Sequence, residues 1–171
     1  VSVAAPRTGR AGAGVHHRWV AFYAPMKPPD HPRPSGDRRI AQLTLAALDR
    51  AGLAPRLVSR LRVIDMDGDP ALQARLADAA AGEAARLIDA LSADPPAAWV
   101  SYHCHYKAPD LIGPVVSRAL ALPYLLTEPS LAPRRLSGPW ARFAAEAEAA
   151  DRGADRLFWT TGRDRPALEA A

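Results

Sequence analysis

Two histidines and a cysteine stand side by side in the segment WVSYHCHYKAPD, residues 99–110, directly after a short apolar run. In an extended chain, residues two apart point to the same side, so His103 and His105 are expected to face one way and Cys104 the other. A neutral imidazole both donates and accepts hydrogen bonds, and Lys107 adds a positive charge. We expect at least one histidine to bind a polar ligand; the simpler alternative is a strand that ends in hydrogen-bonded histidines.

A metal ion is the other chemistry that paired histidines suggest. A catalytic zinc site takes its protein ligands from His, Glu or Cys, and Glu128 at the next expected strand end is the one plausible third ligand. No second cluster of ligand residues accompanies the pair, so we expect no stoichiometric metal. The segment DMDGD, residues 65–69, lacks the loop length and terminal glutamate of a calcium-binding EF-hand and is predicted to be a turn.

A second candidate site is the segment PSGDRR, residues 34–39, which precedes an expected helix. Gly36 would let the backbone come close to a ligand, and the helix N-terminus that carries Asp37 and Arg38 favours an anion. Ser35 or Asp37 could instead only cap the helix, and both roles can hold together. No Gly-Lys-Ser/Thr follows the glycine, so this is not a Walker loop.

A third candidate is the segment TEPSLAPRR, residues 127–135, after another expected strand. The carboxylate of Glu128 could accept hydrogen bonds from sugar hydroxyls. The guanidinium groups of Arg134 and Arg135 could bind phosphate or pyrophosphate. The alternative is that these are surface charges on a loop.

The elements that must position these residues alternate along the chain. Apolar and aromatic runs predict five strands, at residues 19–25, 55–60, 97–103, 123–129 and 156–161. Helical periodicity predicts a helix after each strand, and the last of them begins within residues 163–171. This alternation predicts an α/β fold, a Rossmann-like open parallel sheet with helices on both faces. Ligands bind beyond the carboxyl ends of such strands, so Gly36, His105 and Glu128 are expected to line one cleft there.

The helical periodicity also predicts which residues are buried. The stripe expected for the first helix is Ile40, Leu43, Thr44, Ala47, Leu48 and Ala51. The stripe expected for the short third helix is Ile112, Val115, Val116 and Ala119.

Composition limits the class of protein. The chain has 171 residues, 49% of them apolar, and this length suits one domain at residues 19–171 after a disordered tail at residues 1–18. The net charge of +4 owes much to arginines in that tail. Arginine outnumbers lysine as in GC-rich bacterial genomes, and no basic helix face supports nucleic-acid binding. With a single cysteine, no signal peptide and no membrane-spanning run, we expect a cytoplasmic protein, with peripheral membrane contact left open.

Three longer segments carry a resemblance to a known family: FYAPMKPPDHPRPSGDRRIAQLTLAAL, SYHCHYKAPDLIGPVVSRALALPYLLTEPS and AEAADRGADRLFWTT. In their order and spacing, from Trp19 onward, the chain resembles the N-terminal domain of a bacterial glycosyltransferase of the two-Rossmann-domain GT-B fold, close to the retaining family 4. The sequence departs from the family where many members have a second glycine beside Gly36 and a histidine in place of Glu128.

The resemblance implies an acceptor-side domain of an enzyme that transfers a hexose from a nucleotide sugar. It also implies that the glycine loop lies near the donor phosphates and that a histidine matching His105 lies beside the sugar. The nucleotide sugar would be a co-substrate, no other cofactor is expected, and a C-terminal domain would bind it. That domain does not follow in this sequence. We therefore expect a truncated or separately encoded half, which turns over no nucleotide sugar alone and self-associates through exposed apolar surface.

Two alternatives of other classes stay open. One is a stand-alone flavodoxin-like binding or regulatory module without catalysis. The other is a zinc-assisted hydrolase built on His103, His105 and Glu128. If His105 belongs to a ligand-binding loop, replacing it by alanine should change stability by no more than about 0.5 kcal/mol.

Overall fold

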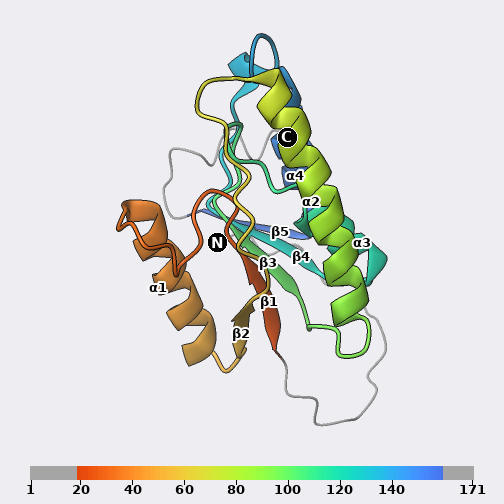
Figure 1. The fold of residues 1–171 in the computed structure, drawn as a ribbon. Coiled ribbons are helices and arrows are strands. Elements are labelled where there is room, and N and C mark those ends of the chain that lie inside the picture. The colour runs from red at the N-terminus through yellow and green to blue at the C-terminus, as the bar shows by residue number, and fades with distance from the viewer. Residues whose placement is uncertain (1–18, 160–171) are drawn as a thin grey trace.

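The computed structural model describes residues 19–159, which form a five-stranded parallel sheet (Figure 1). The strands are β1 (Val20–Tyr23), β2 (Pro55–Leu57), β3 (Trp99–Tyr102), β4 (Tyr124–Thr127) and β5 (Arg156–Phe158). Their order across the sheet is β2-β1-β3-β4-β5. All five predicted strands are therefore present, each shorter than expected. The expected tail at residues 1–18, the end of the fifth strand and the expected last helix lie outside the described residues.

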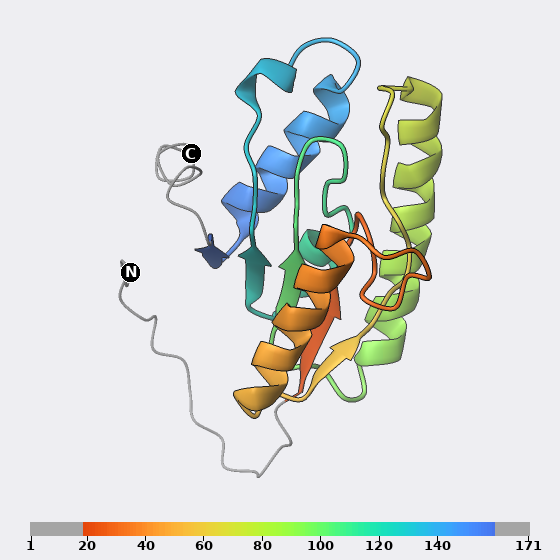
Figure 2. The same ribbon diagram turned by 90° about the vertical axis from the view of Figure 1, so that its left-hand side faces the viewer.

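Four helices and one short 3-10 helix connect the strands. They are α1 (Gly36–Arg50), α2 (Pro70–Leu91), α3 (Gly113–Ala119), α4 (Ala141–Gly153) and η1 (Pro133–Arg135). Figure 2 shows α1 in front of the sheet and α2 and α4 behind it. The α/β prediction, a Rossmann-like parallel sheet with helices on both faces, is confirmed.

The strand order places a switch point between β1 and β3. The chain leaves β1 for β2 on one side, then crosses back over β1 to β3 and continues outward to β4 and β5. As a result α1 covers one face while the later helices cover the other. In doubly wound sheets this arrangement opens a crevice at the carboxyl ends of the two strands that flank the switch point.

Alternate side chains of the strands pack into two apolar cores, one on each face of the sheet. On the side of α2, α3 and α4 the core is built around Tyr23, Trp99 and Phe143, all fully buried. On the side of α1 a smaller core holds Phe22, Tyr102 and Ala41. Adjacent residues of one strand thus enter opposite cores, which fixes the direction in which each strand end presents its next side chains.

The predicted buried stripe of α1 is wrong for most of its members, although Leu48 packs against the core as expected. Ile40 and Leu43 are 37% and 46% exposed, whereas Ala41 is fully buried. Leu45 and Leu48 pack beside Ala41 in the same core. Apolar residues occupy two neighbouring stripes of this helix, and periodicity alone does not tell which of them meets the sheet. The stripe predicted for α3 is half right, because Ile112 and Val116 are fully buried whereas Val115 is 47% exposed and Ala119 is exposed.

A buried polar network supports the start of α3. The carboxylate of Asp110, 1% exposed, accepts hydrogen bonds from the backbone N–H groups of Ile112 and Gly113 at 3.0 and 2.7 Å. Its other oxygen accepts from the hydroxyls of Ser101 and Tyr124. Burial raises the pKa of Asp110, and these donors oppose the rise. The network ties β3, β4 and α3 together directly behind the loop that carries the histidines.

Two further sequence expectations bear on the surface. No helix within residues 19–159 is long and apolar enough to cross a bilayer. On β5, Phe158 is 51% exposed. This exposed ring agrees with the apolar surface on which the expectation of self-association depends, and sedimentation of the purified chain would test that expectation.

Candidate functional site

The candidate residues lie where the strands end. In Figure 2 the arrows of β1, β3 and β4 point upward, and the connections after β3 and β4 rise above the sheet on the side where α1 begins. The connection from β1 to α1 reaches the same edge, because strands β1, β3 and β4 run parallel with aligned register. Sequence segments that are far apart along the chain therefore share one edge of the sheet.

Ser35 caps the start of α1, which is one of the two caps that the sequence suggested. The Ser35 side chain accepts a hydrogen bond from the Arg38 backbone N–H at 3.2 Å. Gly36 is exposed, and a Cβ added there would meet nothing within 4 Å. The protein itself therefore does not require glycine at this position, and the space in front of the helix is open. Arg38 and Gln42 donate side-chain hydrogen bonds to the Pro29 carbonyl and hold the preceding loop against the helix.

Asp37 in the first turn of α1 reaches the end of β3. Its Oδ1 lies 3.0 Å from His103 Nδ1, and the two side chains remain 32% and 24% exposed. Since a carboxylate oxygen only accepts, His103 Nδ1 carries the proton and, in the neutral ring, Nε2 is left as an acceptor. Asp37 and His103 were both predicted as site residues. Their direct contact was not predicted from the sequence.

The backbone is strained at two matching positions of neighbouring strands. His103 directly follows β3 with φ of 62°, and Glu128 directly follows β4 with φ of 53°. The register pairs Tyr102 with Thr127, so these two residues occupy equivalent places. A left-handed conformation costs a non-glycine residue about 1 kcal/mol or more and concentrates at functional sites. Here it turns both side chains out of the strand direction at the switch-point edge.

His105 lies two residues further along, in a tight loop. Its backbone exchanges hydrogen bonds with Ala108, and its Nδ1 accepts from the Lys107 backbone N–H at 2.9 Å. Nε2 therefore carries the proton and acts as a donor. Burial lowers the pKa of His105 to about 4, with a further contribution from His103, so the ring is neutral at pH 7.

The two histidines present complementary nitrogens. Their ring centroids are 4.9 Å apart and the rings stand at 75°. Nε2 of His103 can accept a hydrogen bond, and Nε2 of His105 can donate one. A hydroxyl group, which does both, matches this pair, and the Asp37–His103 contact has the composition of a dyad that can take up a hydroxyl proton.

Cys104 and Glu128 lie in environments that differ from that of the histidine pair. Cys104 is fully buried in the core behind the sheet, as predicted, and burial raises its thiol pKa well above the ordinary value. Glu128 forms a side-chain hydrogen bond with Tyr102, whose pKa is raised first by burial and then by the charge of Glu128. Glu128 thus lies at the carboxyl edge, engaged with a tyrosine of the α1-side core.

Lys107 and Arg134 take different positions. The Lys107 ammonium lies over aromatic rings, 5.9 Å from the centroid of Tyr106 and 5.4 Å from that of Trp140. Arg134 is exposed on η1, where its neighbour Arg135 approaches the same two rings. Tyr106 and Trp140 were not predicted as site residues; the aromatic spacing alone gave no indication that they would meet.

The described residues offer no ligand set for the zinc ion of the hydrolase hypothesis. Within residues 19–159, no group of three or more His, Cys, Asp or Glu side chains is arranged to hold a metal ion. His105 Nδ1 accepts a backbone N–H, so its Nε2 carries the proton and is not a metal ligand, and Glu128 is hydrogen-bonded to Tyr102. His103, His105 and Glu128 therefore share an edge without forming a metal triad.

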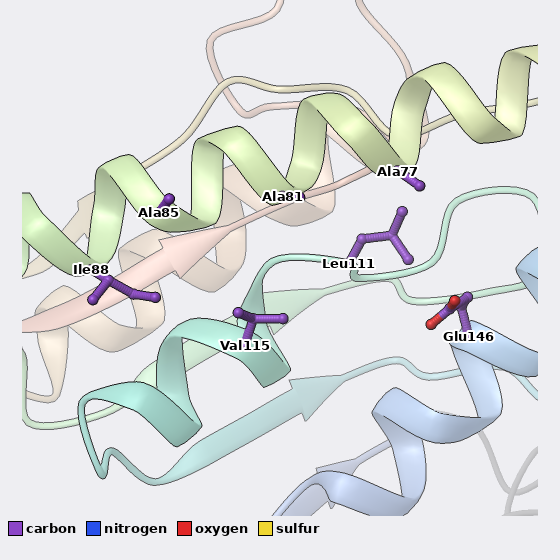
Figure 3. Close-up of a pocket in the computed structure, with 7 residues that line it drawn as sticks. All are labelled: Ala77, Ala81, Ala85, Ile88, Leu111, Val115 and Glu146. Atoms are coloured by element: carbon purple, nitrogen blue, oxygen red, sulfur yellow. The ribbon is translucent and has the colours of Figure 1, made fainter.

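A separate pocket of about 300 Å³ lies between α2, α3 and α4 (Figure 3). Its lining is aliphatic apart from Glu146, with Ala77, Ala81 and Ala85 at helical spacing along α2. None of the predicted site residues lines this pocket. The predicted polar site residues within 19–159 therefore lie at the strand ends and not in this pocket.

The fold and the site define a doubly wound α/β domain with polar side chains gathered at the carboxyl ends of its strands. Comparisons of the chain with protein-family models, with curated proteins and with solved structures found no match. Its function must therefore be argued from the site itself.

Proposed function

We propose that this chain is the acceptor-side domain of a glycosyltransferase that transfers a hexose from a nucleotide sugar. The observation that carries the proposal is the contact between the His103 and His105 rings, whose centroids are 4.9 Å apart and whose Nδ1 atoms are engaged by Asp37 and the Lys107 N–H, which leaves Nε2 as an acceptor on one ring and a donor on the other. Such a pair suits a sugar hydroxyl, which donates to one nitrogen while it accepts from the other. The resemblance of the sequence to the family-4 enzymes supports the same assignment.

The reaction joins an acceptor hydroxyl oxygen to the anomeric carbon of the donor sugar. The bond from that carbon to the diphosphate oxygen breaks, the diphosphate leaves with its electron pair, and His103 Nε2, backed by Asp37, takes up the hydroxyl proton. Enzymes achieve this mostly by orientation and charge stabilisation. In the proposal His103 and His105 orient the hydroxyl, and Gly36, Asp37 and Arg38 flank it.

The donor would be held by a second domain, either elsewhere in the protein or in a separate chain. The lone cysteine, which is buried, fits a reducing compartment, and we place the protein in the cytoplasm. Glu128, Lys107 and Arg134 extend the acceptor site along the same edge.

A second candidate function is a flavodoxin-like binding or regulatory module. The observation that favours it is the strand order β2-β1-β3-β4-β5, which is the flavodoxin-like order. Such a module would bind a flavin phosphate at the same switch point and would need neither histidine as a hydroxyl partner. The two candidates therefore differ in ligand class and in dependence on the histidines.

The test is an NMR titration of the purified chain with methyl glucoside, with methyl mannoside and with flavin mononucleotide. We expect a methyl hexoside to shift resonances of the β3–α3 loop. His103→Ala and His105→Ala should each weaken that binding about tenfold, the loss expected for one hydrogen bond of about 1.4 kcal/mol. Hexoside binding that is unchanged in both variants contradicts the proposal, and binding of the flavin alone supports the second candidate.

His31 offers a matched control for His105. Its Nδ1 also accepts from a backbone N–H two residues on, that of Arg33 at 3.1 Å. His31→Ala removes the same kind of local hydrogen bond without touching the histidine pair, so it should leave hexoside binding unchanged. Both variants should change the free energy of unfolding by no more than about 0.5 kcal/mol, measured by urea denaturation.

A further inference from the structure

A compact group of aromatic and cationic side chains lies next to the histidines. The rings of Tyr106 and Trp140 meet edge to face, with centroids 5.9 Å apart at 90°. The Lys107 ammonium and the Arg135 guanidinium each lie within 6 Å of both centroids. We call Tyr106, Lys107, Arg135 and Trp140 the aromatic–cation cluster.

Among the described residues, the two cations of this cluster have no anionic partner. Within residues 19–159, neither Lys107 nor Arg135 forms an ion pair, whereas Arg60 and Arg86 pair with carboxylates at 2.6 and 2.7 Å. Two positive charges beside the same pair of rings repel each other until an anion joins them. An aromatic face attracts a cation only weakly at a partly exposed site, so the cluster keeps most of its capacity to bind an anion.

The cluster is held in place by the turn that begins at Asp65. The Asp65 backbone N–H donates to the Lys107 carbonyl at 2.9 Å, and the Trp140 indole N–H donates to the Asp65 carbonyl at 3.2 Å. One buried residue therefore fixes two members that are far apart in the sequence.

The turn itself is rigid. The Asp65 carboxylate accepts from the backbone N–H groups of Asp67 and Gly68 and from the Gln73 amide. The same amide donates to the Pro139 carbonyl at 2.9 Å, next to Trp140. A site whose parts are fixed before binding loses little conformational freedom when the ligand arrives.

Consecutive ring contacts join the cluster to the histidine pair. His103 and His105 are 4.9 Å apart, His105 and Tyr106 are 5.4 Å apart, and Tyr106 leads on to Trp140. The cluster therefore adjoins the place where the proposed function puts the sugar hydroxyl.

We infer that the aromatic–cation cluster binds a phosphate monoester carried by the sugar acceptor, with Lys107 and Arg135 on the phosphate and the rings of Tyr106 and Trp140 against the apolar face of the sugar. The inference rests on the proposed function and names its substrate class. A phosphate monoester carries about −1.5 to −2 charge at pH 7, which matches two cations, whereas a carboxylate carries one charge. Arginine adds the fork geometry that phosphate oxygens accept.

The experiment compares two probes by NMR titration of the purified chain: methyl glucoside, and glucose esterified with phosphate on its primary hydroxyl. The phosphate should strengthen binding about tenfold or more, and Lys107→Ala or Arg135→Ala should each remove about tenfold of it. Binding of methyl glucoside should change little in Arg135→Ala. Lys107→Arg, unlike Lys107→Ala, should keep most of the increase in affinity that the phosphate provides.

Arg56 provides the control for an ordinary cation–aromatic contact. Its guanidinium lies 4.5 Å from the ring centroid of Trp19, and it also approaches Asp94. Arg56→Ala should leave binding of both probes unchanged. A loss as large as that of Arg135→Ala would mean that general positive charge attracts the phosphate, and it would overturn the inference.

The outcomes separate this inference from the proposed function. Equal binding of the two probes, lost in His103→Ala, overturns the phosphate assignment and leaves the function standing. Failure of both probes to bind overturns both. Vesicles of phosphatidylcholine, with and without phosphatidic acid, distinguish the source: binding only to the acidic vesicles assigns the phosphate to a lipid, and binding of the soluble ester assigns it to a free sugar phosphate.

Discussion

Replacing Gly113 by alanine is expected to lower the free energy of unfolding by about 3 kcal/mol, the upper range for a methyl group forced into a packed core. A Cβ at this position would stand 2.7 Å from both Trp99 Nε1 and the Tyr124 ring, and closer still to an Asp110 oxygen. Real Cβ atoms do not approach other atoms so closely, so the surroundings would have to move.

Those surroundings cannot move without breaking hydrogen bonds. The Asp110 carboxylate accepts from the hydroxyls of Ser101 and Tyr124 and from two backbone N–H groups, and Trp99 Nε1 donates to Ser101 at 2.8 Å. A shift of this group would leave buried donors unsatisfied, which costs about 1–3 kcal/mol for each of them.

Gly82 is the matched control, because it also lies in a helix. It is exposed in the middle of α2, and a Cβ there would meet nothing within 4 Å. Gly82→Ala should raise the free energy of unfolding by about 0.5–1 kcal/mol through helix propensity alone. Urea unfolding followed by circular dichroism measures both variants, and a Gly113→Ala variant as stable as the wild type would contradict this packing.

The fold was predictable because its pattern is local. Each strand is an apolar run of a few residues, and each helix shows its own periodicity, so the alternation could be read without tertiary information. Placing the histidine loop at the carboxyl edge follows from that alternation and the parallel sheet. The two stripes of α1 show the limit, since Ile40 and Leu43 satisfy the period as well as Ala41 and Leu45 do.

The contacts that define the site were not predictable, because they join distant segments. Asp37 and His103 are 66 residues apart, and Trp140 reaches the Asp65 carbonyl across 75 residues. Asp65 and Asp110 look like surface loop acids in the sequence. They are buried because the N–H groups of the turns that they begin need acceptors away from water.

Asp151 gives a large expected dependence of stability on pH. It lies on α4, 3% exposed, and neither carboxylate oxygen has a hydrogen-bond partner among residues 19–159. Burial, with a smaller contribution from Glu148, raises the pKa of Asp151 to about 7. An ordinary aspartate titrates near pH 4, so the folded protein keeps a proton that the unfolded chain releases.

The sign follows from this difference in bound protons. Between about pH 4 and pH 7 the folded state binds one more proton than the unfolded state at this residue, so stability falls as the pH rises. The fall is complete above pH 7 and amounts to at most about 4 kcal/mol, at about 1.4 kcal/mol for each pH unit.

Asp151→Asn should therefore stabilise the protein in a pH-dependent way. The variant keeps the size of the side chain and removes its ionisation, so its advantage over the wild type should be small near pH 4 and reach about 2–4 kcal/mol at pH 8. Asp78→Asn, an exposed change on α2, should stay within about 0.5 kcal/mol at both pH values. Urea midpoints at several pH values provide the measurement. An advantage of Asp151→Asn that does not grow with pH would mean that the Asp151 carboxylate finds a partner or water in solution.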